Sequence, residues 1–204
     1  MTKIFGEFLE DFSERSEFLV LGFSPSSMSI QQRWKNNGLS ADFLGDYVKN
    51  FFPGDTNAAV NKQTEVRSAV SFIANELLEN AMKYSDINAG VPINLEVHLF
   101  SDRLIFASKN SISQSAIAHF QAYIQKLLTA DIGEMYVSQI EDKTGSGSGL
   151  GYLTMVMDYD AVLGWKFEDT ASPQTIYPIT TPIVNEAIST EIATTVTTMV
   201  QLSL

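Results

Sequence analysis

The longest regular pattern of hydrophobic and polar positions spans residues 63–85 and is helical. This stretch contains no glycine or proline and is rich in Glu, Leu, Ala, Met and Lys, which favour helices. Its apolar residues recur every three or four positions, as on a helix that packs one face against a sheet. These residues are Val70, Ile73, Ala74, Leu77 and Ala81. We therefore expect one long helix here, preceded by a loop at residues 55–61.

Two segments after this helix have the pattern of β-strands. Residues 93–100 alternate apolar with polar side chains, and residues 103–107 form a second, mostly apolar run. The dipeptide Ser101-Asp102 between them predicts a tight hairpin. We expect the two strands to lie side by side in one sheet.

Helical and extended patterns alternate in the rest of the chain. The residue pattern predicts helices at residues 114–128, 133–140 and 150–158, and β-strands at residues 161–168 and 194–204. This order of elements suits a sheet that helices cover on one face. The fold class that we expect is therefore α+β, a two-layer α/β sandwich with a mixed, mostly antiparallel sheet.

We expect the first sixty residues to form an extension that precedes the main domain. Apolar residues at helical spacing predict a helix at residues 4–12, and an apolar run predicts a short strand at residues 18–23. Turn-forming residues follow, and further helices are expected at residues 28–34 and 41–52. The segment contains no catalytic pattern, so we expect it to form a partner surface, a dimer element or an extra layer.

The composition indicates a folded protein and excludes several classes of function. Apolar residues make up 45% of the 204 residues, which is enough for a hydrophobic core. The net charge of −11 disfavours binding to a nucleic-acid backbone. The absence of cysteine excludes disulfides and cysteine nucleophiles. The chain has neither a signal-peptide pattern nor an apolar run of ~20 residues, so we expect a cytoplasmic protein without membrane contact.

Three polar residues that line up on the predicted helix 63–85 suggest a chemical site. Glu76, Asn80 and Lys83 fall within roughly 60° of one another at 3.6 residues per turn. A carboxylate, an amide and an ammonium group in this arrangement can serve a base, a metal ion and a phosphate. Glu79 is a rival carboxylate, but it points about 100° away from Asn80. An ordinary solvated helix face is the alternative, because these residue types are common on surfaces.

A glycine-rich segment some sixty positions later can surround a phosphate group. A glycine occupies every second position between residues 144 and 152, as Gly145, Gly147, Gly149 and Gly151, and a helical pattern follows. Backbone N–H groups and the helix dipole at such a turn attract anions. The segment is not a Walker loop, because no Gly-Lys-Ser/Thr sequence follows. A flexible Gly/Ser linker is the alternative.

Together, residues 75–85 and 144–152 resemble the N box and the G2 box of the GHKL family, the ATP-binding fold shared by gyrase, Hsp90 chaperones, histidine kinases and MutL. The predicted order of elements is also that of the histidine-kinase-like ATPase fold. The resemblance implies that residues 61–204 form an ATP-binding domain with ATP and Mg²⁺ as ligands. It also implies Glu76 as catalytic base, Asn80 as Mg²⁺ ligand, Lys83 as phosphate contact, and Gly147, Gly149 and Gly151 as the phosphate lid.

The G1 box of that family, an Asp-x-Gly-x-Gly whose aspartate binds the adenine amine, is not matched. The corresponding segment, residues 105–113, contains neither aspartate nor glycine. Asn110 is the best substitute, since its side-chain oxygen can accept a hydrogen bond from the adenine amine. That hydrogen bond would be weaker than one to a carboxylate, and the missing glycines imply a pocket of different shape.

Within the family, the chain resembles the stand-alone branch of anti-sigma-factor-like serine kinases, because it lacks a sensor and a histidine domain. Those kinases bind ATP and phosphorylate a serine of a small antagonist protein, which switches partner binding. The resemblance implies a bacterial signal-transduction kinase for serine or threonine, with an antagonist or sigma-factor-like partner and a possible homodimer. Two alternatives remain: a degenerate module that recognises a protein partner without nucleotide, and a plain ATP hydrolase.

Overall fold

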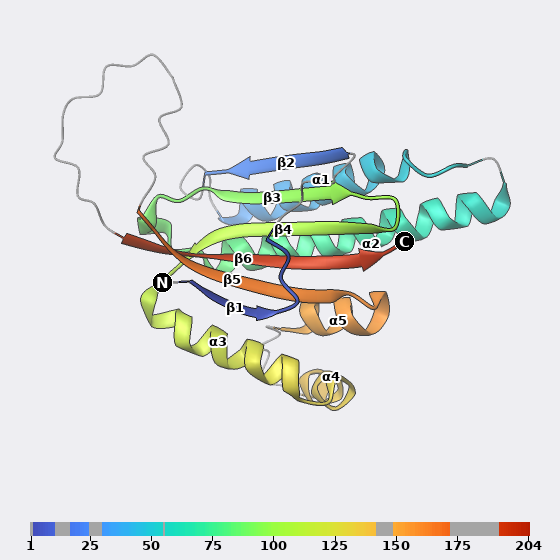
Figure 1. Cartoon of the computed structure of the whole chain (residues 1–204). Coiled ribbons are helices and arrows are strands. Elements are labelled where there is room, and N and C mark those ends of the chain that lie inside the picture. Colours follow the sequence, from blue (N-terminus) through green and yellow to red (C-terminus); the bar gives the residue numbers. More distant parts are fainter. Residues whose placement is uncertain (1, 11–16, 25–29, 55, 142–148, 172–191) are drawn as a thin grey trace, which may run out of the picture.

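The computed structural model describes residues 2–10, 17–24, 30–54, 56–141, 149–171 and 192–204. These residues form a six-stranded sheet with the order β1-β5-β6-β4-β3-β2 (Figure 1). The strands are β1 (Lys3–Gly6), β2 (Glu17–Phe23), β3 (Ile93–Leu99), β4 (Arg103–Ile112), β5 (Val162–Ala171) and β6 (Ile192–Ser203). Each pair of neighbouring strands is antiparallel. The α+β class is confirmed, and the sheet is antiparallel rather than mixed in the part of the chain that is described.

In the described ranges, five α-helices accompany the sheet. They are α1 (Ile30–Lys49), α2 (Asn57–Tyr84), α3 (Gln114–Thr129), α4 (Ile132–Glu141) and α5 (Leu150–Tyr159), and a 3₁₀ helix (Ile87–Ala89) follows α2. Figure 1 shows α1 and α2 behind β2, β3 and β4, whereas α3, α4 and α5 lie towards β1 and β5. Buried residues of all five α-helices and of the sheet belong to one hydrophobic cluster, so the helices cover one face as predicted.

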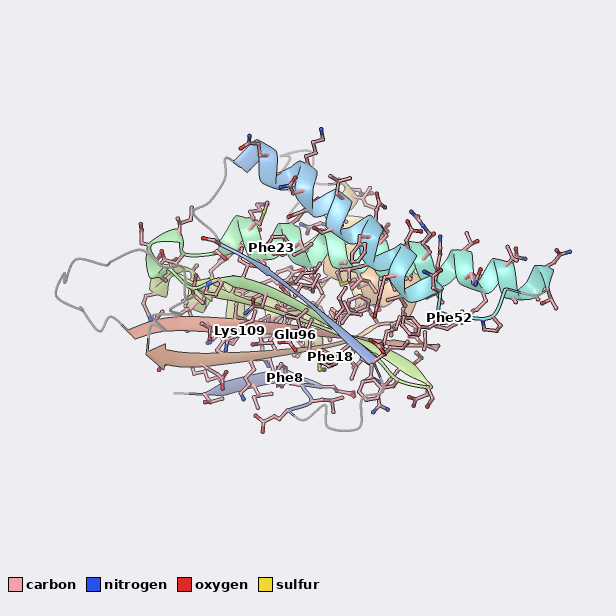
Figure 2. All side chains as sticks on the ribbon, turned by 90° about the horizontal axis from the view of Figure 1, so that it is seen from above. Phe8, Phe18, Phe23, Phe52, Glu96 and Lys109 are labelled. Carbon is pink, nitrogen blue, oxygen red and sulfur yellow. The ribbon has the colours of Figure 1, made fainter. Side chains whose placement is uncertain are left out.

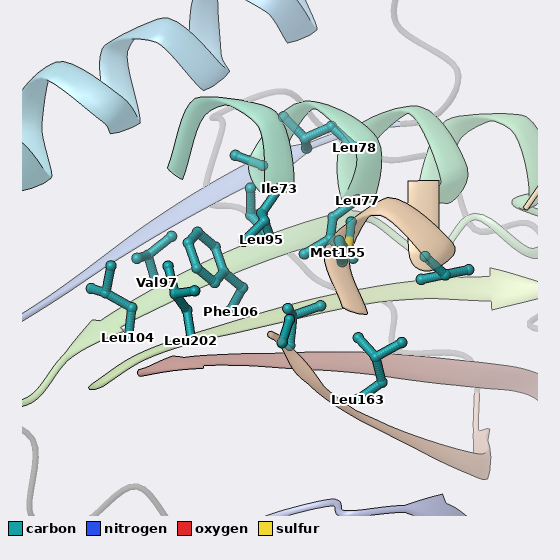
Figure 3. Packing of buried hydrophobic residues seen from close by; sticks show 14 of the residues in the cluster. Ile73, Leu77, Leu78, Leu95, Val97, Leu104, Phe106, Met155, Leu163 and Leu202 are labelled. Atoms are coloured by element: carbon teal, nitrogen blue, oxygen red, sulfur yellow. The ribbon is translucent and has the colours of Figure 1, made fainter. Parts of the chain in front are cut away.

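Helix α2 is the element that positions the candidate site. It begins at Asn57, six residues earlier than predicted, because the Thr56 hydroxyl caps it by accepting a hydrogen bond from the Ala59 amide over 3.1 Å. Its predicted apolar stripe is buried in the core. Figure 3 shows Ile73, Leu77 and Leu78 of α2 packed over core residues of the sheet. These sheet residues are Leu95 and Val97 of β3 and Leu104 and Phe106 of β4.

The N-terminal segment begins with a strand, so the helix predicted at residues 4–12 is wrong in its described part. β1 pairs with β5, and Gly6 has a φ of 65°, a left-handed conformation that interrupts a helix. The Glu7 amide then donates a hydrogen bond to the Leu163 carbonyl over 3.0 Å. In Figure 2, Phe8 lies on the opposite side of the sheet from α1 and α2. The segment therefore starts to cross the face that these helices leave open.

Two further elements differ from the prediction. A single helix, α1, replaces the helices expected at residues 28–34 and 41–52, and Gly38 is accommodated inside it with no other atom near. The second strand of the hairpin, β4, continues beyond residue 107 to Ile112, which pairs with Thr194 of β6. The remaining strands and helices lie where the pattern predicts them, to within a few residues.

Strands of the first sixty residues belong to the same sheet as the rest of the chain. β1 pairs with β5 at one edge, and β2 pairs with β3 at the other. Backbone hydrogen bonds thus connect the N-terminal segment to residues 61–204 at both edges of the sheet. None of the helices in the described ranges combines the length and the apolar character needed to cross a membrane.

Candidate functional site

The C-terminal half of α2 and the first turn of α5 line a polar depression with a cavity volume of about 180 Å³. The structure brings the predicted residues Glu76, Asn80 and Lys83 to this one place. Gly149 and Gly151 from the glycine-rich segment also line it, whereas Gly147 lies outside the described residues. The other lining residues are Trp34 of α1, Glu79 and Leu150. The two sequence motifs therefore meet in space.

Glu76 packs directly against the backbone of α5. A Cβ atom added to Gly151 would overlap with the Glu76 carboxylate, so a larger residue at 151 would displace that side chain. Burial, with a smaller contribution from the charge of Glu79, raises the pKa of Glu76. A carboxylate with a raised pKa is a stronger proton acceptor, which suits a general base.

The two carboxylates at the depression differ in their partners. The Asn75 side-chain amide donates a hydrogen bond to Glu79 Oε1 over 2.7 Å, which holds Glu79 along its own helix. Glu76 instead contacts α5. Lys83 is exposed, with Nζ 5.3 Å from the centre of the Tyr84 ring. Its positive charge offsets one of the two carboxylates of the depression.

Replacement of Glu76 by glutamine should stabilise the protein at neutral pH. The raised pKa means that ionisation of Glu76 disfavours folding, and this cost grows as the pH rises from the unfolded to the folded pKa. Because the side chain is only half-buried, we expect a gain of about 0.5 kcal/mol at pH 7. Thermal melting at pH 4 and pH 7 measures it, with exposed Glu65→Gln on the same helix as control. An equal effect at both pH values would contradict the prediction.

A second, larger cavity of about 270 Å³ opens beside the depression, between α2, α3 and the sheet. No carboxylate, lysine or arginine occurs among the described residues that line it. The lining is mostly apolar and aromatic: Leu77, Asn80, Ala81, Tyr84, Ser108, Asn110, Ile112, Ala116, His119, Phe120, Tyr123, Gly149, Tyr152, Val196 and Thr198. Asn80 and Gly149 line both cavities, so the two are adjacent. A ligand with a flat, mostly apolar part and an anionic tail could occupy both cavities at once.

Three tyrosines of this cavity were not singled out by the sequence patterns. The Tyr123 hydroxyl donates a hydrogen bond to the Gly149 carbonyl over 3.1 Å and thereby holds the start of α5. Burial raises the pKa of Tyr123 and of Tyr152, so both are neutral hydroxyls at pH 7. Tyr152 directly follows the glycine-rich segment, and this position could have indicated that it lies at the cavity. Tyr84 adjoins the helix motif, whereas Tyr123, on α3, has no such signal.

Two polar residues of the larger cavity come from β4. Ser108 is 2% exposed, and its hydroxyl has no hydrogen-bond partner within the described residues. Asn110 donates from Nδ2 to the Ser111 carbonyl over 2.7 Å. Because β4 stays a regular strand here, its alternate side chains at 108 and 110 lie on one face. The strand β4 thus runs on to Ile112 and places Ser108 and Asn110 among the residues that line the cavity.

Comparison with known proteins gives a likeness of fold. Neither the models of known protein families nor the curated proteins include a match to the sequence. Among solved structures, a chain of the SiaB–SiaC complex from Pseudomonas aeruginosa is similar, with a TM-score of 0.51 and 11% sequence identity. The similarity covers 91% of this chain and 89% of that chain. At this identity the comparison shows a shared fold, and the neighbour is part of a protein complex.

Proposed function

We propose that this chain is a regulatory protein that binds ATP and Mg²⁺ and phosphorylates a serine or threonine of a protein partner. The observation that carries the proposal is the pair of adjacent cavities, one apolar and one polar. The polar one combines two carboxylates, an amide, an ammonium group and a helix N-terminus. The similar solved chain belongs to a complex of two proteins, which supports a protein partner for this chain as well.

The base and the phosphates of ATP divide between the two cavities in this proposal. The larger cavity, with its aromatic rings and neutral polar groups, takes the base. The depression takes the phosphates, because the N-terminus of α5 and Lys83 both favour negative charge. Gly149, at the N-cap of α5 with φ of 109°, lies where the two parts join.

Asn80 fits the role of a Mg²⁺ ligand. Its amide oxygen is a hard ligand without charge, and the residue lines both cavities. Mg²⁺ usually keeps several waters and takes further ligands from phosphates, so it needs few protein groups. Within the described ranges, no cluster of three or more His, Cys, Asp or Glu side chains is placed to hold a metal. A bound Mg²⁺ would supply neutralisation of the phosphate charge.

In this proposal Glu76 carries out the proton transfer. It would accept the proton of the partner's hydroxyl group as that oxygen forms a bond to the γ-phosphorus. The bond from the γ-phosphorus to the bridging oxygen breaks at the same time, and ADP leaves. The contact between Glu76 and Gly151 would hold the Glu76 carboxylate beside the phosphate-binding turn. Any displacement of α5 would then also move the Glu76 carboxylate.

Replacement of Asn80 by alanine should weaken ATP binding at least about tenfold and remove its dependence on Mg²⁺. Calorimetric titration of the pure protein with ATP, with and without Mg²⁺, measures both quantities. The matched control is Asn88→Ala, an exposed asparagine of the 3₁₀ helix that lines neither cavity. Circular dichroism shows whether each variant is folded. A phosphorylated partner would then be sought with the wild-type protein and labelled ATP.

The second candidate function is that of a module that recognises a protein partner and has lost the ability to bind nucleotide. The observation that favours it is the regular strand β4, which runs to Ile112 where the related family has a glycine-rich turn. Folded wild-type protein that shows no heat of ATP binding at any Mg²⁺ concentration would exclude the kinase proposal. That result would leave the module as the function of this fold.

A further inference from the structure

We infer that Trp34 of α1 contacts the segment of the protein partner that carries the acceptor hydroxyl group. The inference rests on the proposed function and deepens it, because it names the place where the partner meets the site. It depends on the position of Trp34 at the depression, on the exposure of its ring, and on the charges of the groups around it.

Trp34 continues the buried side of α1. The buried positions of this helix, each at most 2% exposed, include Asn37, Ala41, Leu44 and Val48. Their spacing of three and four residues places Trp34 on the same side, one turn earlier. The Asn37 side-chain amide donates a hydrogen bond to Met82 Sδ over 3.3 Å, which holds this part of α1 beside the end of α2. Trp34 is nevertheless 55% exposed, because it borders the depression instead of the core.

Trp34 belongs to the part of the site that lies away from the base. Trp34 and Glu76 line the depression but not the larger cavity, whereas Asn80 and Gly149 line both. A nucleotide whose base occupies the larger cavity would therefore extend past Asn80 and Gly149 and place its terminal phosphate in the depression. Figure 1 shows α1 and α5 on different sides of α2, so α1 forms a boundary of the depression that α5 does not provide.

The acceptor segment has to enter the same depression. In phosphoryl transfer the attacking and the leaving oxygens lie roughly in line, so the acceptor oxygen approaches from the side opposite the rest of the nucleotide. The proposed base, Glu76, must also reach the acceptor hydroxyl. The residues that carry this hydroxyl would then lie against the outer boundary of the depression, which includes Trp34.

The chemical character of this boundary suits a peptide. Two carboxylates, Glu76 and Glu79, face one ammonium group, Lys83, and the chain has a net charge of −11. These charges favour a neutral or basic segment over a further anionic group. The uncharged indole ring of Trp34 offers apolar surface that a peptide can bury, and tryptophan is enriched among the residues that contribute most to protein–protein binding.

The test uses a conjugate in which the γ-phosphate of ATP is esterified to the serine hydroxyl of N-acetyl-Ala-Ser-Ala amide. Calorimetry with Mg²⁺ measures the affinities of ATP and of this conjugate for the wild type and for Trp34→Ala. The ratio of the two affinities cancels any effect of the substitution on ATP itself. We expect the conjugate-to-ATP ratio to fall about tenfold in Trp34→Ala and to be partly restored in Trp34→Phe. An unchanged ratio in Trp34→Ala would overturn the inference.

The matched control is Leu39→Ala. Leu39 is an apolar residue of the same helix, is 61% exposed and lines neither cavity. Its replacement should leave the conjugate-to-ATP ratio at the wild-type value, and an equal fall in both variants would overturn the inference. Because Trp34 and Leu39 are both exposed, we expect all these variants to fold, which circular dichroism checks.

Quenching of tryptophan fluorescence by acrylamide gives a second measurement on the unmodified protein. The chain has two tryptophans, and Trp165 is fully buried, so quenching by a dissolved molecule reports on Trp34. The conjugate should reduce the quenching of Trp34 more than ATP does. Equal protection by ATP and by the conjugate would show that Trp34 contacts the phosphates instead, and it would overturn the assignment to the partner.

Binding of ATP itself separates this inference from the proposed function. If ATP binds with Mg²⁺ and the conjugate-to-ATP ratio is the same in the wild type and in Trp34→Ala, ATP binding stands and the contact with the partner fails. If the folded wild type binds neither ATP nor the conjugate, the proposed function fails and the inference fails with it.

Discussion

Under the proposed function, we expect replacement of Ala116 by phenylalanine to lower the affinity for ATP by about 100-fold or more, because the new ring would occupy the larger cavity. Ala116 lies in the first turn of α3 and lines the cavity of about 270 Å³. The cavity is mostly apolar, so the ring should find favourable contacts there, and such substitutions often stabilise a protein. We therefore expect thermal stability to be retained while calorimetry detects little or no binding.

The matched control for this prediction is Ala118→Phe. Ala118 lies two positions further along the same helix, is exposed and does not line the cavity. The Ala118→Phe variant should bind ATP as the wild type does. Wild-type affinity in folded Ala116→Phe would show that the base binds elsewhere, and it would contradict the placement of the base in the larger cavity.

Replacement of Gly164 by alanine should lower the free energy of unfolding by about 2 kcal/mol. A Cβ atom at this position would lie 2.8 Å from backbone atoms of Glu7 and Phe8. These backbone atoms cannot move aside as a flexible side chain can. Gly164 also pairs with Gly6, so the substitution should push the N-terminal segment off the open face of the sheet.

Urea denaturation of Gly164→Ala and Gly38→Ala measures this effect with the same chemical change at two sites. Gly38 is inside α1 with no other atom near its missing side chain, so alanine there should stabilise the protein by up to about 1 kcal/mol. Hydrogen exchange of the Glu7 amide, which donates to the Leu163 carbonyl, shows whether the loss is local. A change of less than about 0.5 kcal/mol in Gly164→Ala would contradict the prediction.

The sequence predicts the elements whose pattern is both local and long. Helix α2 repeats its apolar stripe over many turns, and β3 alternates over its whole length, so each pattern has a single interpretation. β1 has only four residues, and its partner β5 lies at the other end of the chain, so spacing alone suggests a helix. In α1, packing against α2 outweighs the helix-breaking tendency of Gly38.

The two parts of the candidate site also differ in how far the sequence predicts them. Glu76, Asn80 and Lys83 lie on one helix, so helical geometry alone predicts that they come together. The residues of the larger cavity come from α2, α3, α5, β4 and β6, and only the tertiary fold brings them together. Asn110 was predicted from a family pattern, whereas Ser108, Thr198 and Tyr123 follow from no local signal. Their chemical roles remain predictions that the binding experiments test.

The position of β6 has a consequence for the rate and order of folding. It is the last strand in sequence, yet it lies between β4 and β5 in the middle of the sheet. Its pairing with β4, and that of β1 with β5, join residues that are far apart along the chain. Such non-local pairing makes folding slow, on the order of milliseconds to seconds. Because β6 contributes Val196 and Thr198 to the larger cavity, that cavity can form only after this strand has docked.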